Sequence, residues 1–83
     1  MNTHDLKLAV AIGAKLREQR AMAGLTLNQM AAAAGISVQQ VSRYENGDAI
    51  PSLKSLLAMA KRLGCPASEF LLSASPQSQR DKP

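Results

Sequence analysis

Residues 26–47 of the 83-residue chain read TLNQMAAAAGISVQQVSRYENG, and this segment is the most informative about the fold. It holds the pattern Ser/Thr-x-x-Gln twice, at 26–29 and 37–40, and that pattern is typical of a capping box at the start of a helix. Gly35 follows the first helix and Asn46-Gly47 the second, and both signals are typical of a helix end. We therefore expect two short helices that are joined by a tight turn.

Three further helices are expected around this pair. The first covers about 6–23, where Leu8, Ile12 and Leu16 recur every four residues before Gly24. The clearest amphipathic pattern begins after Pro51-Ser52 and ends at Gly64, with apolar residues at i, i+3, i+4 and i+7. These residues are Leu53, Leu56, Leu57, Ala60 and Leu63. A short last helix is expected at about 67–72, with Phe70 and Leu71 on its apolar face.

The composition favours a small all-α domain. Apolar residues make up 46% of the chain, but Tyr44 and Phe70 are its only aromatic residues. Fourteen alanines suit closely packed helices, whereas Val, Ile and Thr together number eight, too few for a protein built on a sheet. The length fits one domain and makes a catalytic cleft between two lobes improbable.

The sequence argues against several classes of protein. The longest apolar run, 8–14, has seven residues, whereas a membrane span needs roughly 20. We see no signal-peptide pattern, so we expect a cytoplasmic, nucleoid-associated protein. The single Cys65 has no partner for an intrachain disulfide and suits a small buried apolar role. His4 and Cys65 are isolated, and no metal-ligand cluster or glycine-rich phosphate loop is present. We therefore expect neither an enzyme nor a cofactor or metal.

The formal net charge is +4 and the sequence pI is about 9.7, which mildly favours an anionic partner. The pair of short helices indicates which one. In a helix-turn-helix motif the second helix enters the major groove of double-stranded DNA and the first lies across the backbone. Ala31, Gly35 and Val41 have the size and spacing that such a pair requires.

Further segments extend this pattern on both sides. They are Ile12-Gly13-x-x-Leu16-Arg17-x-x-Arg20, Gly24-Leu25-Thr26, Met30-Ala31, Ala34-Gly35-Ile36-Ser37, Val41-Ser42-Arg43-Tyr44-Glu45-Asn46-Gly47, Pro51-Ser52-Leu53 and Leu63-Gly64. With them the chain resembles the lambda-repressor/Cro-type helix-turn-helix family, also called the XRE family, over nearly all of residues 12–71. The resemblance implies a five-helix domain that binds DNA sequence-specifically, usually as a homodimeric repressor.

Two charged residues are expected to form a structural ion pair. Arg20 comes four residues after Leu16, and Glu45 four after Val41, so each lies on the apolar stripe of its helix. An unpaired buried charge is very costly, so the two should pair and tie the first helix to the third. The resembled family has such a pair at these positions.

The outward face of the third helix is the expected DNA-reading surface. Base contacts are predicted for Val38, Gln39, Ser42 and Arg43, since an Arg fork matches guanine, Gln matches adenine and Val suits a thymine methyl. Phosphate contacts are predicted for Thr26, Ser37, Gln40, Asn46 and Lys54. For Gln40 and Ser42 a merely solvated role stays open.

Three positions depart from the family's pattern. Leu27 stands where a Gln is common, and it either packs inwards or forms an apolar spot on the DNA side. Asp48 follows Asn46-Gly47 where a basic residue is frequent, which removes attraction for phosphate. Pro66 replaces the usual cap of the last helix, so that helix should begin irregularly.

The expected organisation is a helix-turn-helix domain at 12–71 with its motif at about 27–46. Residues 1–11 form an N-terminal extension and the start of the first helix, and 72–83 a disordered polar tail. That tail is either a linker to a further domain or a simple end. A homodimer through Phe70, Leu71 and Leu72 is expected to bind a palindromic operator as a repressor or autoregulator. The alternative is a protein-interaction module, such as an antitoxin or adaptor, in which DNA binding is secondary.

Overall fold

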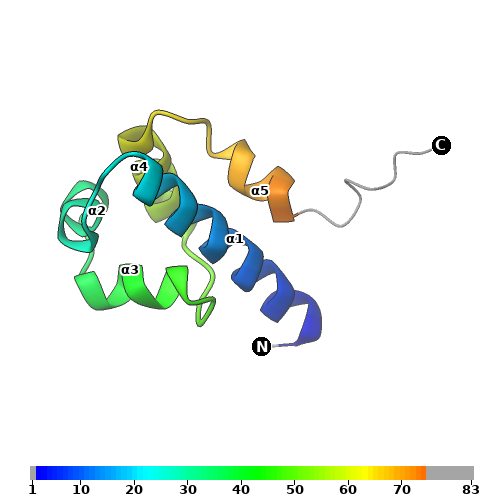
Figure 1. Ribbon diagram of the computed structural model, residues 1–83. Coiled ribbons are helices and arrows are strands. Elements are labelled where there is room, and N and C mark those ends of the chain that lie inside the picture. Colours follow the sequence, from blue (N-terminus) through cyan, green and yellow to red (C-terminus); the bar gives the residue numbers. More distant parts are fainter. Residues whose placement is uncertain (1, 75–83) are drawn as a thin grey trace.

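The computed structural model describes residues 2–74, and these fold into five helices without a strand (Figure 1). The helices are α1 (Thr3–Met22), α2 (Leu27–Ala34), α3 (Val38–Glu45), α4 (Leu53–Leu63) and α5 (Ser68–Ala74). The all-α, five-helix prediction is therefore confirmed. Residues 72–74, predicted as part of a disordered tail, belong to α5, and the remainder of that predicted tail lies outside the described residues.

Local capping sets most helix boundaries. Thr26 and Gln29 form the complete predicted capping box of α2. Helix α1 begins three residues before the predicted Leu6, because the Asn2 side chain accepts a hydrogen bond from the backbone N–H of Asp5 at 2.8 Å. Helix α5 begins with i,i+3 backbone bonds from Glu69 to Pro66 and from Phe70 to Ala67, the irregular start expected from Pro66.

The core lies between α1 and the other helices. Helix α1 packs against both α3 and α5, while α2 packs against α3 and α4 (Figure 1). The largest fully buried side chains come from all five helices: Ile12, Leu16, Met30, Val41, Met59 and Phe70. Both short helices of the motif therefore depend on the same apolar core for their position.

Two glycines allow α1 to approach the C-terminal end of α3 closely. A Cβ on Gly13 would overlap the Tyr44 carbonyl oxygen and lie 2.8 Å from that of Glu45. Gly47 has a φ of +77°, and a Cβ there would lie 2.8 Å from Cγ2 of Val10. Larger residues at either glycine would push α3 away from α1, so this backbone contact fixes the distance between the two helices.

The predicted apolar stripe of α4 is wrong at two positions. Leu53 and Leu57 are 66% and 51% exposed, whereas Leu56, Met59 and Ala60 are buried. The stripe read from the sequence is wider than the surface that α4 packs against its neighbours. Leu53 and Leu57 lie one turn apart on its outer edge, where no other described element covers them. Within residues 2–74, no helix is long and apolar enough to cross a membrane.

Candidate DNA-binding surface

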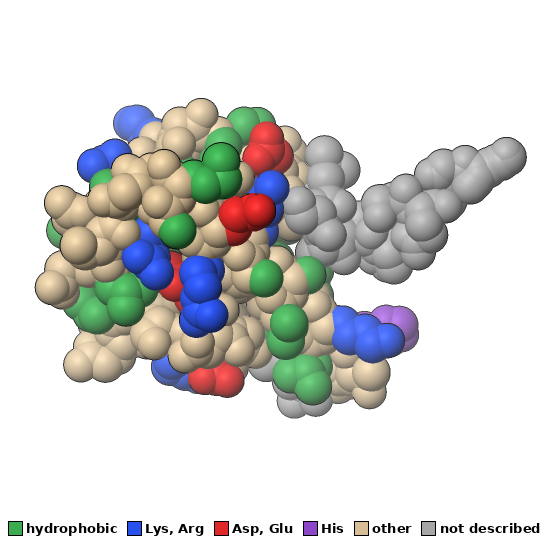
Figure 2. Space-filling model, in the orientation of Figure 1, with side chains coloured by type: hydrophobic (Ala, Val, Ile, Leu, Met, Phe, Trp, Pro, Cys, Tyr) green, Lys and Arg blue, Asp and Glu red, His purple; other side chains and the backbone are tan. Residues whose placement is uncertain are grey.

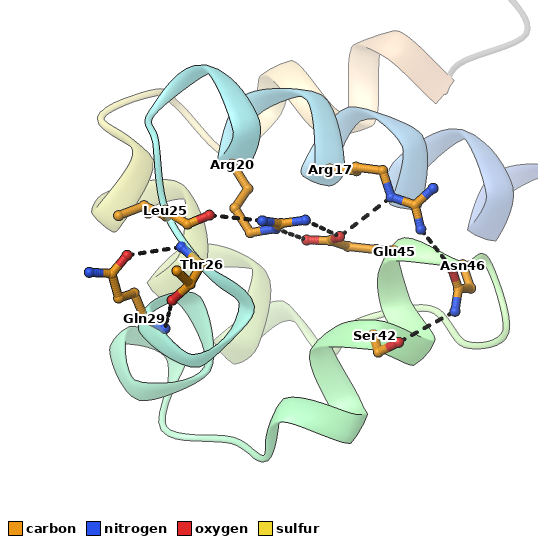
Figure 3. A network of polar contacts seen from close by, with 8 residues as sticks. All are labelled: Arg17, Arg20, Leu25, Thr26, Gln29, Ser42, Glu45 and Asn46. Carbon is orange, nitrogen blue, oxygen red and sulfur yellow. Dashed lines mark hydrogen bonds and ion pairs between the residues drawn. The ribbon is translucent and has the colours of Figure 1, made fainter.

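A buried ion pair positions α3 on α1, as predicted (Figure 3). Arg20 donates to both carboxylate oxygens of Glu45, from Nε at 2.7 Å and from Nη2 at 3.1 Å. Arg20 also donates from Nη1 to the Leu25 carbonyl at 2.8 Å, which ties the joint between α1 and α2 to the same group. The Glu45 side chain is 2% exposed and that of Arg20 18%. This two-bond arrangement sets the rotation of α3 about its axis.

The hydrogen bond that Arg20 donates to Glu45 raises the pKa of the Arg20 guanidinium above its ordinary value, although burial opposes the shift. The guanidinium is therefore charged at neutral pH.

A second cation, Arg17, lies at this pair and was not predicted from the sequence. The Nε of Arg17 lies 3.6 Å from Oε1 of Glu45, and its Nη2 donates to Oδ1 of Asn46 at 2.7 Å (Figure 3). Arg17 lies one helical turn before Arg20, so the two point to the same side of α1. That spacing was the available signal for a shared partner.

The outward face of α3 is polar. Gln39 and Arg43 are exposed, while Val38, Gln40 and Ser42 are half-buried. Val38 packs partly against the core, so only part of its side chain is open to a partner. Arg43 donates to Oε1 of Gln40 at 3.4 Å, a long bond that exposed side chains exchange easily. The four predicted base-reading residues therefore share one helix face, with Gln39 and Arg43 its most accessible members.

The predicted phosphate contacts occupy several places. Thr26 and Ser37 are exposed N-cap residues, and each hydroxyl accepts one backbone N–H, from Gln29 and Gln40 respectively. Their own O–H protons remain available as donors. The Gln40 side chain bonds to Arg43 and does not complete the second predicted capping box among the described contacts. Lys54 is exposed in the first turn of α4.

Asn46 differs from the other predicted phosphate contacts because both ends of its amide have partners. Its Oδ1 accepts from Arg17, and its Nδ2 donates to Oγ of Ser42 at a long 3.4 Å (Figure 3). The side chain is nevertheless exposed. Asn46 therefore joins the C-terminal end of α3 to α1.

The surface charge is dispersed. Figure 2 shows Lys and Arg side chains scattered over this side of the molecule, with acidic side chains among them. Asp48 is exposed directly after α3, whereas Leu27 packs partly against the core, so its inward alternative is the observed one. A partner bound through this surface must rely on a few placed contacts more than on a broad positive field.

The predicted dimer residues need a correction. Phe70 is fully buried and belongs to the core between α5 and α1, so it has no surface to offer a second copy. Leu71 is 47% exposed. Leu72 belongs to α5, but its side chain is not among those that the structure describes. The apolar pattern of a short helix does not distinguish a residue of the core from a residue of an interface, so the sequence alone could not separate Phe70 from Leu71.

The model of a family described as "Helix-turn-helix" matches residues 16–70, which is most of the chain. The chain belongs to the XRE-type helix-turn-helix family of DNA-binding transcriptional regulators. The match begins at Leu16 in α1 and ends at Phe70 in α5, so it spans the ion pair and the whole helix-turn-helix motif. The solved structures that resemble the chain are those of a gene regulator and of a controller protein.

Solved structures of regulators agree with this family. The clp gene regulator ClgR from Corynebacterium glutamicum superposes with a TM-score of 0.76 at 34% identity, over 81% of this chain and 71% of that one. A second ClgR structure gives 0.74 at 32% identity, over 90% and 96%. The restriction-modification controller protein C.AhdI from Aeromonas hydrophila gives 0.71 at 31%, over 75% and 94%. A search of curated proteins found no match.

Proposed function

We propose that this helix-turn-helix protein is a repressor or autoregulator that binds a palindromic operator as a homodimer. The observation that carries the proposal is the division of α3 into two faces. Val41, Tyr44 and Glu45 are buried, while Gln39 and Arg43 are exposed on the opposite side. A helix held rigidly by its inner face presents its outer side chains to base edges at low entropic cost.

The residues assigned to DNA divide into two groups in this proposal. Gln39, Ser42 and Arg43 read bases in the major groove, with a smaller apolar contribution from Val38. The hydroxyls of Thr26 and Ser37, together with Gln40, Asn46 and Lys54, bind phosphates and set the register of the domain on the duplex. Such a regulator would act in the cytoplasm, in association with the nucleoid.

The homodimer follows from the limited reach of one domain. Helix α3 has eight residues and contacts few base pairs, so useful specificity requires two half-sites about one helical turn, roughly 34 Å, apart. Leu71 is 47% exposed at the end of the described side chains and is the proposed centre of the interface. The similarity to ClgR, a gene regulator, and to C.AhdI, a controller protein, supports a regulatory role.

Selection of bound sequences from a random duplex pool tests the proposal. We expect enrichment of one inverted repeat with half-site centres about 10 base pairs apart. Titration of that duplex should yield a complex of two protomers, and Leu71→Lys should weaken the two-protomer complex while leaving the fold intact. An enriched site without symmetry, or a saturated complex with a single protomer, would refute the homodimer.

A second candidate is the protein-interaction module, because Leu53 and Leu57 are exposed side by side on α4. An antitoxin or adaptor would use such a surface to hold a protein partner. Failure of the selection to enrich any sequence, with equal weak affinity for all duplexes, would favour this candidate over the regulator.

A further inference from the structure

The three charged side chains at the contact between α1 and α3 have a net charge of +1. Arg17 and Arg20 contribute two positive charges, and Glu45 contributes one negative charge, which leaves one positive charge uncompensated among the three. Arg20 already makes two bonds to Glu45 and one to the Leu25 carbonyl. The surplus therefore resides on Arg17, whose side chain is 57% exposed against 18% for Arg20.

Arg17 can leave Glu45 without exposing a buried charge. Its Nε lies 3.6 Å from the carboxylate, whereas that of Arg20 lies at 2.7 Å. Glu45 therefore stays paired when Arg17 turns outwards. An exposed guanidinium whose charge Glu45 does not neutralise is suited to bind an anion from outside the protein.

The position of Arg17 connects it to the polar face of α3. Its Nη2 bonds to Oδ1 of Asn46, whose Nδ2 bonds to Oγ of Ser42 (Figure 3). Asn46 follows Ser42 by four residues and Arg43 by three, so all three lie on one side of the helix end. A continuous polar row thus leads from a predicted base-reading residue to a cation on α1.

We propose that Arg17 and Asn46 together bind one phosphate group of the DNA backbone at the C-terminal end of α3. The inference rests on the proposed DNA-binding function and adds Arg17 to the residues assigned to it. Arg17 supplies further guanidinium N–H donors, and the Asn46 N–H₂ group has a second proton besides the one that it donates to Ser42. Thr26 and Ser37 hold phosphate at the helix N-termini, so the two sites would flank the reading face of α3.

The salt dependence of binding tests this assignment. Each neutralised phosphate contributes about 0.9 to the slope of log affinity against log salt, so Arg17→Gln should reduce the dimer's slope by about 1.8. The affinity at low salt should fall by about tenfold per protomer, and equally on the selected operator and on random duplex, because phosphates carry no sequence information. Arg17→Lys keeps the charge and should retain the slope.

Two controls keep the result interpretable. Arg62→Gln removes an exposed cation from the last turn of α4 and should leave the slope unchanged. Thermal melting of Arg17→Gln should stay within about 8 °C of the wild-type protein, since Glu45 keeps Arg20 and an exposed ion pair is worth at most about 1 kcal/mol. A larger drop would assign Arg17 a structural role and overturn the proposal.

The remaining outcomes separate this inference from the proposed function. If the wild-type protein prefers its operator and Arg17→Gln keeps the wild-type slope, Arg17 binds no phosphate and only this inference fails. A loss on the operator without a loss on random duplex would mean that Arg17 acts through the placement of α3, which also overturns it. If the wild-type protein binds neither duplex at low salt, the function and this inference fail together.

Discussion

The ion pair between α1 and α3 makes a strong prediction for the replacement of Glu45 by alanine. Removal of the carboxylate leaves Arg20, 18% exposed, without its charged partner, and breaking a buried pair in this way costs about 3–5 kcal/mol. The structure favours the lower end of that range, because Arg20 keeps its 2.8 Å bond to the Leu25 carbonyl and some contact with water. We therefore expect Glu45→Ala to lower the free energy of unfolding by about 3 kcal/mol.

Such a loss is large for a domain of this size. Small domains have about 5–15 kcal/mol in total, and 1 kcal/mol shifts Tm by about 4–8 °C at this length. Urea unfolding followed by circular dichroism measures the change directly, with an m-value like that of the wild-type protein. A loss below about 1 kcal/mol would refute the reasoning that the pair is desolvated and holds α3 in place.

Two variants locate the origin of the effect. Arg17→Ala removes only the exposed partner, so it should cost no more than about 1 kcal/mol. The double variant Arg20→Met with Glu45→Leu leaves neither charge buried and should recover much of the stability lost in Glu45→Ala. A double variant as unstable as the sum of its single changes would show that the two side chains do not act as a pair.

Four other predictions follow from the same contacts. Gly13→Ala should lower the free energy of unfolding by about 1–3 kcal/mol in urea titrations, because the new Cβ meets backbone carbonyls that cannot move aside. A gain in stability would contradict the close approach of α1 and α3. Arg43→Ala should cost about 1–3 kcal/mol of binding free energy on the selected operator and much less on random duplex. Asp48→Lys should strengthen binding to both duplexes about equally. An equal loss for Arg43→Ala on both duplexes would show that Arg43 binds phosphate. The wild-type dimer should show a salt slope of about −4 to −5, from two to three ionic contacts per protomer, and a much steeper slope would mean that cations outside this surface take part. Burial, followed by the nearby Glu69, raises the pKa of the Cys65 thiol, so the folded state binds the thiol proton more tightly than the unfolded state does. The free energy of unfolding should therefore fall as pH rises from the unfolded-state pKa to the folded-state pKa. Cys65→Ala should remove this alkaline loss in pH-dependent melting, and an unchanged loss would assign it to other groups.

Local sequence signals determined the helices of this protein and the identity of its motif. Capping residues and glycines act over three or four positions, so Thr26 with Gln29, and Gly35 after α2, can be read without a fold. The pairing of Arg20 with Glu45 was also readable, because each lies on an apolar stripe and neither charge can be buried alone. These rules depend on spacing along one helix and on the cost of burying a charge.

The packing of the helices against one another sets which apolar and polar side chains are exposed to solvent. Leu57 fits the amphipathic stripe of α4 but lies outside the contact of α4 with the other helices. Phe70 is buried in the core, whereas its neighbour Leu71 is exposed. Arg17 reaches Glu45 and Asn46 because Gly13 lets α1 approach the end of α3. The distance and rotation between two packed helices are collective results of side-chain packing, and no local pattern encodes them.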